Sequence, residues 1–432
     1  MNRRTFAKHL LTAPVWWSAL AAAASAAEGA PSGLDNEVDD LLRRERLIDT
    51  AAADRFYRHP AEKPRAFHPE AILPLVGGGV LGIGHLVEEI QIREADRTVM
   101  GNSAEITHVS VLDGAGDVQQ ILREFETIRR TVEGHSDQVA VVLTAAAMAE
   151  TIRQGKVALV LGLDTGNETA GDPLVLEELS RLGLRKMAMT HEAATPFCGS
   201  NSSEPKTTPG LNPLGREMVA ACNRLGVMID VSHCSDITFW GVLECTRRPI
   251  IATHSGARAR PGLTRRNLSD DMLRALAKNG GMVGIGGATE RGAYERLKAA
   301  GYYKNLSMIN DWMVRHYPDR FALADALRDP VKLQEARRSL GLPKVMPGSE
   351  EIGNLINPES TLDHLEYVAN LIGFDYVGIG TDLEMHGPDY RPMIRGIAAG
   401  MLKRNYSQEQ IGRIFQGNFL RLFRDNPSPL PG

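Results

Sequence analysis

The sequence predicts an α/β protein, a (β/α)8 barrel of the TIM type with long insertions after its first and seventh strands. Two observations support this prediction. Short runs rich in Val and Ile recur along the chain and are separated by helical stretches, as in parallel strands covered by helices. There are eight such runs, and eight strands that alternate with helices close into a barrel more readily than they form an open sheet. The length of 432 residues also permits two domains, but one barrel with insertions accounts for the whole pattern.

The predicted strands and helices alternate along the chain. The strands cover residues 46–49, 105–112, 157–164, 186–191, 227–233, 249–254, 282–287 and 376–382. The helices between them cover residues 118–133, 145–154, 173–182, 214–225, 237–245, 270–278 and 362–371. The helix at 270–278 is the best marked, because Ser269 can cap its start and two glycines follow its end. The glycines at 79–84 do not directly follow the first strand, which disfavours an open nucleotide-binding sheet.

A single barrel domain with terminal additions is the expected domain organisation. We expect an export signal at residues 1–26, a lead-in at 27–45, the barrel domain at 46–425 and a tail at 426–432. Two segments, 55–102 and 289–360, fit no strand–helix unit. Loops that follow strands roof the active-site face of such a barrel, so both insertions are expected to shape the substrate site.

The charge balance and the hydropathy pattern each exclude one class of protein. Lys and Arg number 49 against 53 Asp and Glu, a net charge of −4, so the chain lacks the basic surplus that nucleic-acid binding requires. The body of the chain has no uninterrupted apolar run of about 18 residues, which excludes a multi-pass membrane protein.

The N-terminus has the order of parts of an export signal. Arg3-Arg4-Thr5-Phe6 precedes an apolar run at residues 10–24, and small residues around Ala26 offer a cleavage site. The arginine pair is typical of the twin-arginine route, although an ordinary secretory signal remains an alternative. We therefore expect a periplasmic protein, with membrane contact only if the signal is kept as an anchor.

The cysteines do not form a disulfide framework. Cys198, Cys222, Cys234 and Cys245 contain no CxxC pair, and a chain of this size needs no disulfide for stability. We interpret them as buried apolar residues, and a disulfide in an oxidising periplasm stays open. The sequence does not decide the oligomeric state, and a homodimer is one option.

Five polar residues fall at the carboxyl ends of different predicted strands. They are Asp164, His191, His233, His254 and Asp382. A barrel assembles its catalytic groups at this edge from scattered positions in the chain. Imidazole nitrogen with carboxylate oxygen is the ligand set of a catalytic zinc ion, which leaves one position for water. The pattern therefore predicts a zinc centre.

Several motifs closely resemble the membrane (renal-type) dipeptidase family, peptidase family M19. They are the runs GLNPLGRE at 210–217 and NRLGVMIDVSH at 223–233, with shorter matches at 189–191, 252–255, 266–270 and 377–382. The resemblance extends from about residue 47 to residue 387. It implies a zinc-dependent hydrolase on a (β/α)8 barrel, in which ordinary members use two bridged metal ions to activate water and cleave dipeptides. A small peptide or amide is then the expected substrate.

The resemblance also implies roles for the metal-site residues. His233 and His254 match the histidines that hold the second metal ion, and Asp164 falls where the family has a bridging glutamate. The family's first-site His and Asp are replaced here by Ala51 and Ala53, which cannot bind metal. Asp54 and His59 lie nearby, but they would not point from the vacated place without a shift of the chain. One zinc ion, held by Asp164, His233 and His254, is therefore expected.

Three further residues match substrate-handling positions of the family. His191 matches a histidine beside the scissile carbonyl, and Arg266 matches the arginine that binds the substrate carboxylate. Asp382 matches the aspartate that handles protons at the leaving amine. These roles suit the chemistry, since a guanidinium grips a carboxylate bidentately and a carboxylate can take and return a proton.

Two hypotheses of different classes follow. The first is a periplasmic hydrolase with one zinc ion, in which Asp382 and His191 are catalytic and Arg266 positions the substrate. The second is a non-catalytic, dipeptidase-like peptide-binding protein in a periplasmic maturation pathway, since losing two ligands can convert an enzyme into a binder. An acid at position 164 favours metal binding but does not decide between them.

Overall fold

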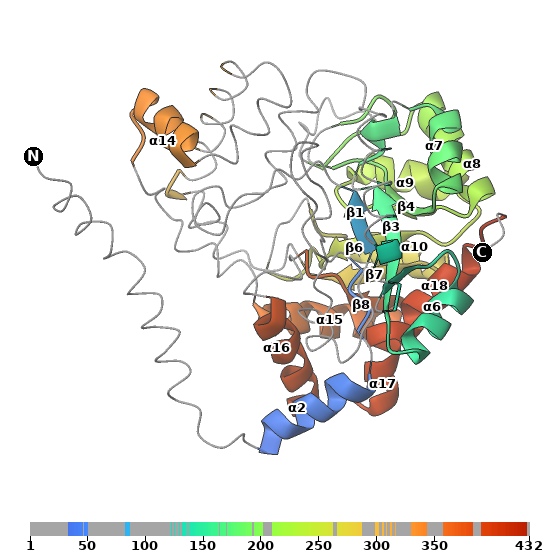
Figure 1. Cartoon of the computed structure of the whole chain (residues 1–432), viewed down its shortest axis with the longest axis vertical. Helices are drawn as coiled ribbons and strands as arrows, with labels where there is room; N and C mark the ends of the chain where they lie inside the picture. Colours follow the sequence, from blue (N-terminus) through green and yellow to red (C-terminus); the bar gives the residue numbers. More distant parts are fainter. Residues whose placement is uncertain are drawn as a thin grey trace, which may run out of the picture.

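The computed structural model describes most of the predicted barrel domain (Figure 1). The described residues are 33–45, 47–50, 83–86, 132–134, 136–137, 139–163, 165–169, 171–191, 194–201, 210–261, 266–286, 299–301, 330–343, 357–382 and 390–429, with single residues at 122, 125, 129, 305, 308, 312 and 316. The expected export signal, the strand at 105–112, most of the helix at 118–133 and the tail from 430 lie outside these residues.

A parallel β-sheet forms the centre of the fold. Its strands are β1 (Ile83–Leu86), β2 (Val139–Val141), β3 (Val157–Leu163), β4 (Leu184–Ala188), β5 (Met228–Asp230), β6 (Ile251–Ser255), β7 (Met282–Ile285) and β8 (Val377–Ile379). Their order is β1-β3-β4-β5-β6-β7-β8, and β2 pairs with the first half of β3 while β1 pairs with the second half. Every pairing between these strands is parallel, which confirms the predicted α/β class.

Asp49 of the first predicted strand and the adjacent Thr50 tie the N-terminal segment to the far end of this sheet. Asp49 forms a parallel bridge with Ile379 of β8. The Thr50 hydroxyl lies 2.6 Å from the carbonyl oxygen of Thr253 on β6 and 2.9 Å from that of Ile379. To reach β6 it passes over Gly284 of β7, where an added Cβ would lie 2.1 Å from the Thr50 hydroxyl oxygen. The sheet therefore curves so that non-neighbouring strands meet on its concave face.

The strand boundaries differ from the prediction in informative ways. The structure has β4 at Leu184–Ala188 instead of 186–191, so the strand begins two residues earlier and includes the fully buried Arg185. In the expected strand at 46–49, the described residues form only the single bridge at Asp49. The segment 55–102, which was predicted to fit no strand–helix unit, contributes β1, and β2 was not predicted. Both are short, so their sequences carry little periodic signal.

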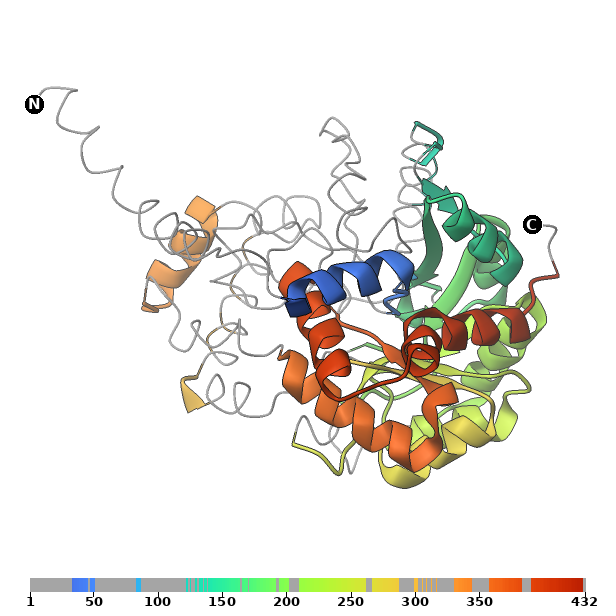
Figure 2. The same cartoon turned by 90° about the horizontal axis from the view of Figure 1, so that it is seen from below.

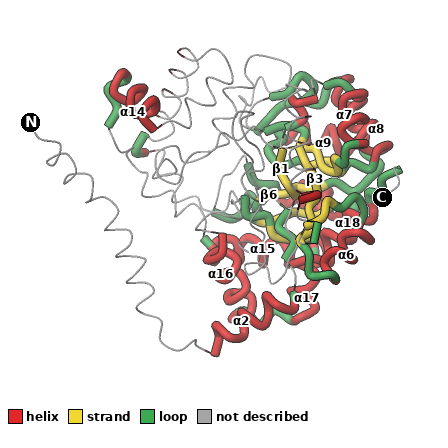
Figure 3. Tube along the Cα trace, in the orientation of Figure 1, coloured by secondary structure: helices red, strands yellow, loops and turns green. Residues whose placement is uncertain are grey.

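Several helices begin where the sequence supplies a cap. The main ones are α2 (Gly33–Arg44), α6 (Ala145–Arg153), α7 (Pro173–Arg181), α8 (Pro213–Leu225), α9 (Asp236–Cys245), α10 (Asp270–Lys278), α14 (Pro330–Ser339), α15 (Pro358–Ile372), α16 (Tyr390–Lys403), α17 (Gln408–Gly412) and α18 (Asn418–Asp425). The Asn212 side chain accepts from Gly215 N at the start of α8, and the Ser269 side chain accepts from Met272 N at the start of α10. Helix α10 has the predicted bounds, and several helices pack around the outside of the sheet (Figures 2 and 3).

The two faces of the sheet bury two separate apolar clusters. Along β3, Val157, Leu159, Leu161 and Leu163 join a large cluster that includes buried residues of α7, α8, α10 and α15. The alternate residues of β3 join a smaller cluster with Met228, Ile251 and Met282, which Phe419 and Phe423 of α18 help to fill. Burial on both faces is why these strands read as continuous apolar runs in the sequence.

Helix α2 docks against α16 through apolar and charged contacts. Val38, Leu41 and Leu42 are buried, and Arg395 on α16 pairs with Asp35 and Asp39. This helix lies within the expected lead-in at 27–45. In the described part of the chain, no helix is long and apolar enough to span a membrane.

The four cysteines are free thiols. Cys198, Cys222 and Cys234 are buried, and Cys245 is half-buried. Burial raises the pKa of Cys198 and that of Cys222 to about 12, so these thiols stay protonated. They pack as small apolar residues, as the sequence indicates.

Candidate active site

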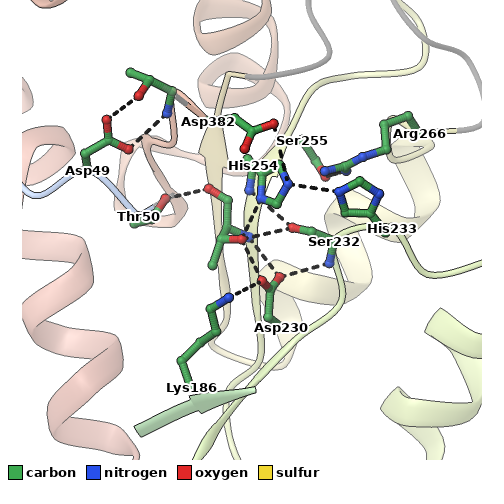
Figure 4. Close-up of polar contacts among 12 residues, drawn as sticks. Asp49, Thr50, Lys186, Asp230, Ser232, His233, His254, Ser255, Arg266 and Asp382 are labelled. Atoms are coloured by element: carbon green, nitrogen blue, oxygen red, sulfur yellow. Dashed lines mark hydrogen bonds and ion pairs between the residues drawn. The ribbon is translucent and has the colours of Figure 1, made fainter. Parts of the chain in front are cut away.

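Four of the predicted site residues gather at the carboxyl edge of the sheet. His191 follows β4, His233 follows β5, His254 lies within β6 and Asp382 follows β8. The ring centroids of His191 and His233 are 4.3 Å apart, and those of His233 and His254 are 5.0 Å apart. The Nε2 atoms of His233 and His254 lie 3.0 Å apart, and a carboxylate oxygen of Asp382 lies 3.9 Å from His254 Nε2. Figure 4 shows how His233, His254 and Asp382 converge.

The backbone at two of these residues adopts a left-handed conformation. His233 has φ 62° and Asp382 has φ 59°, and Asn405 is the other non-glycine residue with positive φ in the part of the chain that the structure describes. Such a conformation costs free energy for most L-residues and persists where the surroundings impose it. At these positions it turns the chain directly after a strand and re-aims the side chain.

The turn at Asp382 is held in place by Asp49, a residue of the first predicted strand. The buried Asp49 carboxylate accepts hydrogen bonds from Thr381 N at 2.9 Å and from the Thr381 hydroxyl at 2.5 Å (Figure 4). Thr381 immediately precedes Asp382, so this pair of hydrogen bonds fixes the turn that carries the Asp382 carboxylate. The Asp382 side chain itself remains 48% exposed.

A buried carboxylate joins β5 to β6 beneath the histidines. One oxygen of Asp230 accepts from Ser232 N at 2.9 Å and Thr253 N at 3.1 Å, and the other accepts from the Thr253 hydroxyl at 2.6 Å. The Lys186 ammonium lies 3.3 Å from this second oxygen. Burial alone would raise the pKa of Asp230, but Lys186 and these hydrogen bonds hold it below its ordinary value.

Arg266 lies in a loop that is anchored at several points. Its Nη1 donates to the Ser255 hydroxyl at the end of β6 over 2.9 Å, and the residue is 8% exposed. The Asn267 side chain accepts from Gly256 N at 2.8 Å. Buried His364 of α15 accepts from Ala257 N at Nδ1 and contacts a carbonyl of the same loop at Nε2. The guanidinium therefore has a fixed place beside the histidines.

The described side chains supply part of the ligand set that a metal ion requires. Two buried imidazoles whose Nε2 atoms converge within 3.0 Å can share one cation, and a carboxylate oxygen is nearby. Within the described ranges, no group of three His, Cys, Asp or Glu side chains is arranged to hold a metal. Asp164, the third predicted ligand, lies outside these ranges, as do Ala51 and Ala53 with the neighbouring Asp54 and His59.

Several residues that shape the site carried no role in the sequence analysis. They are Asp49, Lys186, Asp230, Thr253, Thr381 and His364. A lysine and an aspartate inside two successive apolar strands were a usable signal, because charged side chains are buried only when they are paired. The role of His364 had no such signal, because its partners come from a loop far away in the chain.

The chain is similar to a family of known proteins. The family model for the membrane dipeptidase (peptidase family M19) matches residues 98–428. Dipeptidase tcpJ of Claviceps purpurea (strain 20.1) is 24% identical over 313 residues, which cover 71% of this chain and 60% of that protein. The chain spans between 52% and 63% of the length of three curated fungal dipeptidases that it matches.

Solved structures show the same fold. The crystal structure of the probable dipeptidase PvdM from Pseudomonas aeruginosa has a TM-score of 0.65 at 20% identity, and the match covers 92% of this chain and 99% of that one. A metallo peptidase from Rhodobacter sphaeroides, liganded with a phosphinate mimic of the dipeptide L-Ala-D-Ala, has a TM-score of 0.59 at 18% identity. That match covers 88% of this chain and 99% of the other.

Proposed function

Because the chain belongs to the membrane dipeptidase family, peptidase family M19, we propose that it is a periplasmic metal-dependent hydrolase that cleaves a dipeptide or a small amide. We also propose that its sheet completes the (β/α)8 barrel. The observation that supports the proposal best is the convergence of His233 and His254 beside Asp382 at the carboxyl edge of the sheet.

One zinc ion is the proposed cofactor, held by Asp164, His233 and His254. When bound, zinc would polarise the scissile carbonyl and favour ionisation of the attacking water. The remaining work falls to this chain's own residues. Asp382 accepts the proton of the water and returns it to the leaving amine, His191 lies beside the carbonyl, and Arg266 binds the carboxylate of the substrate.

The second candidate function is peptide binding without catalysis. Its support is the pair Ala51 and Ala53, which replaces two metal ligands of the family. The residues of the candidate site could then hold a peptide in a periplasmic maturation pathway. Export by the twin-arginine route belongs to both candidates and rests on the arginine pair at the N-terminus.

A dipeptide screen tests the activity directly. The mature chain, supplied with zinc, is expected to release amino acids from members of a dipeptide library that includes L-Ala-D-Ala. That dipeptide is chosen because a mimic of it occupies the related structure from Rhodobacter sphaeroides. If the chain cleaves no member of the library, the binding candidate is favoured.

The metal content of the purified mature protein is expected to be about one zinc equivalent per chain, because three ligands with one open position are a complete catalytic set. Elemental analysis measures it, and His233→Ala or Asp164→Ala should abolish it. His316→Ala is the matched control, because His316 stacks on Trp312 and is exposed. Two equivalents would show that the first site survives, and none would favour the binder.

Arg266→Ala is expected to weaken binding of peptides with a free carboxyl terminus by about 2–5 kcal/mol, since it removes one partner of a buried charge pair. Amidated analogues should lose far less. Titration calorimetry on both ligands checks this result. Arg258→Ala is the control, because the Arg258 guanidinium in the same loop is paired with Asp236. Equal losses for the two ligands would remove Arg266 from this role.

A further inference from the structure

A continuous chain of buried polar groups runs from Lys186 to His254. Lys186 and Asp230 are both fully buried, with the ammonium 3.3 Å from a carboxylate oxygen. The same oxygen lies 2.6 Å from the Thr253 hydroxyl, and this hydroxyl oxygen lies 2.8 Å from His254 Nδ1. Figure 4 shows this series of polar contacts leading to the two histidines. Thr253 is thus the link between a charged pair and a proposed metal ligand.

The direction of these hydrogen bonds follows from the state of Asp230. Its first oxygen accepts two backbone N–H groups, and its second faces the Lys186 ammonium. These partners all stabilise the ionised form, which can only accept hydrogen bonds. The Thr253 hydroxyl must therefore donate to Asp230.

A hydroxyl has one proton, so its oxygen can only accept from any other partner. Since the proton of the Thr253 hydroxyl points to Asp230, the contact with His254 requires that Nδ1 of the ring carry a proton. In a neutral imidazole, Nε2 is then the unprotonated nitrogen. That atom faces His233 Nε2 at 3.0 Å, which makes His233 the donor of this contact.

We propose that Thr253 is a positioning residue that holds His254 as the Nδ1–H tautomer and aims the Nε2 lone pair at the metal position. The inference deepens the proposed function, because it names the groups that prepare one ligand for the metal. It also assigns opposite tautomers to the two histidines before metal binds: Nδ1–H for His254 and Nε2–H for His233. A metal ion taken up by both rings would replace the proton that they share.

The test is nitrogen NMR of the full mature chain, labelled with ¹⁵N-histidine, freed of metal and held at roughly pH 8, where an ordinary histidine is neutral. Two-bond proton–nitrogen correlations report which ring nitrogen is protonated. The signals are assigned from their loss in His254→Gln and His233→Gln. The wild type is expected to show the Nδ1–H pattern for His254 and the Nε2–H pattern for His233. An Nε2–H pattern for His254 in the wild type would overturn the proposal.

Thr253→Val supplies the second readout, because valine keeps the shape of threonine and removes the acceptor. We expect His254 to lose its pure Nδ1–H pattern and the zinc affinity, measured by competition with a chromogenic chelator, to fall about 10–100-fold. Thr253→Ser should restore both. Thr151→Val on α6 is the matched control for replacing a buried threonine, and it should change neither.

The outcomes separate this inference from the proposed function. If Thr253→Val leaves both the tautomer and the zinc affinity unchanged, Thr253 has no positioning role, whether or not the protein is a hydrolase. If the tautomers are as assigned but the wild type cleaves no peptide, the positioning role stands and the proposed activity fails. The wild-type spectrum alone can overturn the proposal, so the test stays decisive even if one variant folds poorly.

Discussion

Replacing Asp382 with asparagine is expected to lower the turnover of a cleavable dipeptide by at least about 10²-fold while changing its affinity by less than about tenfold. Asparagine is nearly isosteric with aspartate and also tolerates the left-handed backbone at φ 59°, so the turn should survive. It cannot accept and return a proton, however. Steady-state kinetics, with binding measured separately by calorimetry, tests the result.

The control for this variant is Asp271→Asn on α10, an aspartate whose side chain is 85% exposed, which should leave turnover unchanged. A contrary result has a clear form. If the wild type with zinc restored cleaves no dipeptide in a broad screen, and Asp382→Asn alters affinity alone, then the hydrolase proposal fails and the binding candidate stands.

Lys186→Met is expected to destabilise the protein by about 3–5 kcal/mol, because it leaves the buried Asp230 carboxylate without its cation. Denaturant-induced unfolding measures the loss. The double variant Lys186→Met/Asp230→Asn should be less destabilised than Lys186→Met alone, since asparagine carries no charge to leave uncompensated. A double variant that is less stable than the single one would show that the loss comes from packing.

The same pair predicts a dependence on pH. In the wild type the pKa of Asp230 is lowered, so its contribution to stability is present above its ordinary value near 3.9 and is lost as pH falls below it. Without Lys186, burial should instead raise this pKa, and protonation then favours the folded state. The stability deficit of Lys186→Met should therefore become smaller as the pH is lowered from neutral towards the ordinary pKa of an aspartate.

The bounds of the predicted helices were closer to the structure than those of the predicted strands, but the sequence analysis did not predict α2, α14, α16, α17 and α18. Helix α10 has its expected bounds because Ser269 caps it and glycines follow it, which are local signals. The predicted run for strand β4 began at Lys186 and left out Leu184 and Arg185, although Arg185 is fully buried in the strand. In the structure its guanidinium donates to the carbonyl oxygens of Ser180 and Leu184, which makes its burial tolerable. The guanidinium also donates to the carbonyl oxygen of Leu143, 42 positions away, a contact that depends on the fold and cannot be found from local pattern.

In the candidate site too, the sequence predicted the residues with local signals and did not predict the long-range contacts. The sequence identified His191, His233, His254 and Asp382, because each follows or ends an apolar run, and the structure brings them together. It did not identify what holds them. The Asp49 carboxylate meets Thr381 across 332 positions of the chain, and His364 meets Ala257 across 107. Contacts of this kind follow from how distant segments meet in the fold rather than from the composition of any one segment.

The left-handed backbone at Asp382 also determines which mutations the fold tolerates at this position during evolution. A single base change converts an aspartate codon into one for asparagine or for glycine, and both residues accept φ near 59°. Most other replacements would cost about 1–2 kcal/mol in the backbone alone. The mutations that the fold tolerates best at this position are thus among those that remove the carboxylate. Loss of the Asp382 carboxylate would therefore cost little folding stability. Only selection for its chemical function would keep an aspartate at this position.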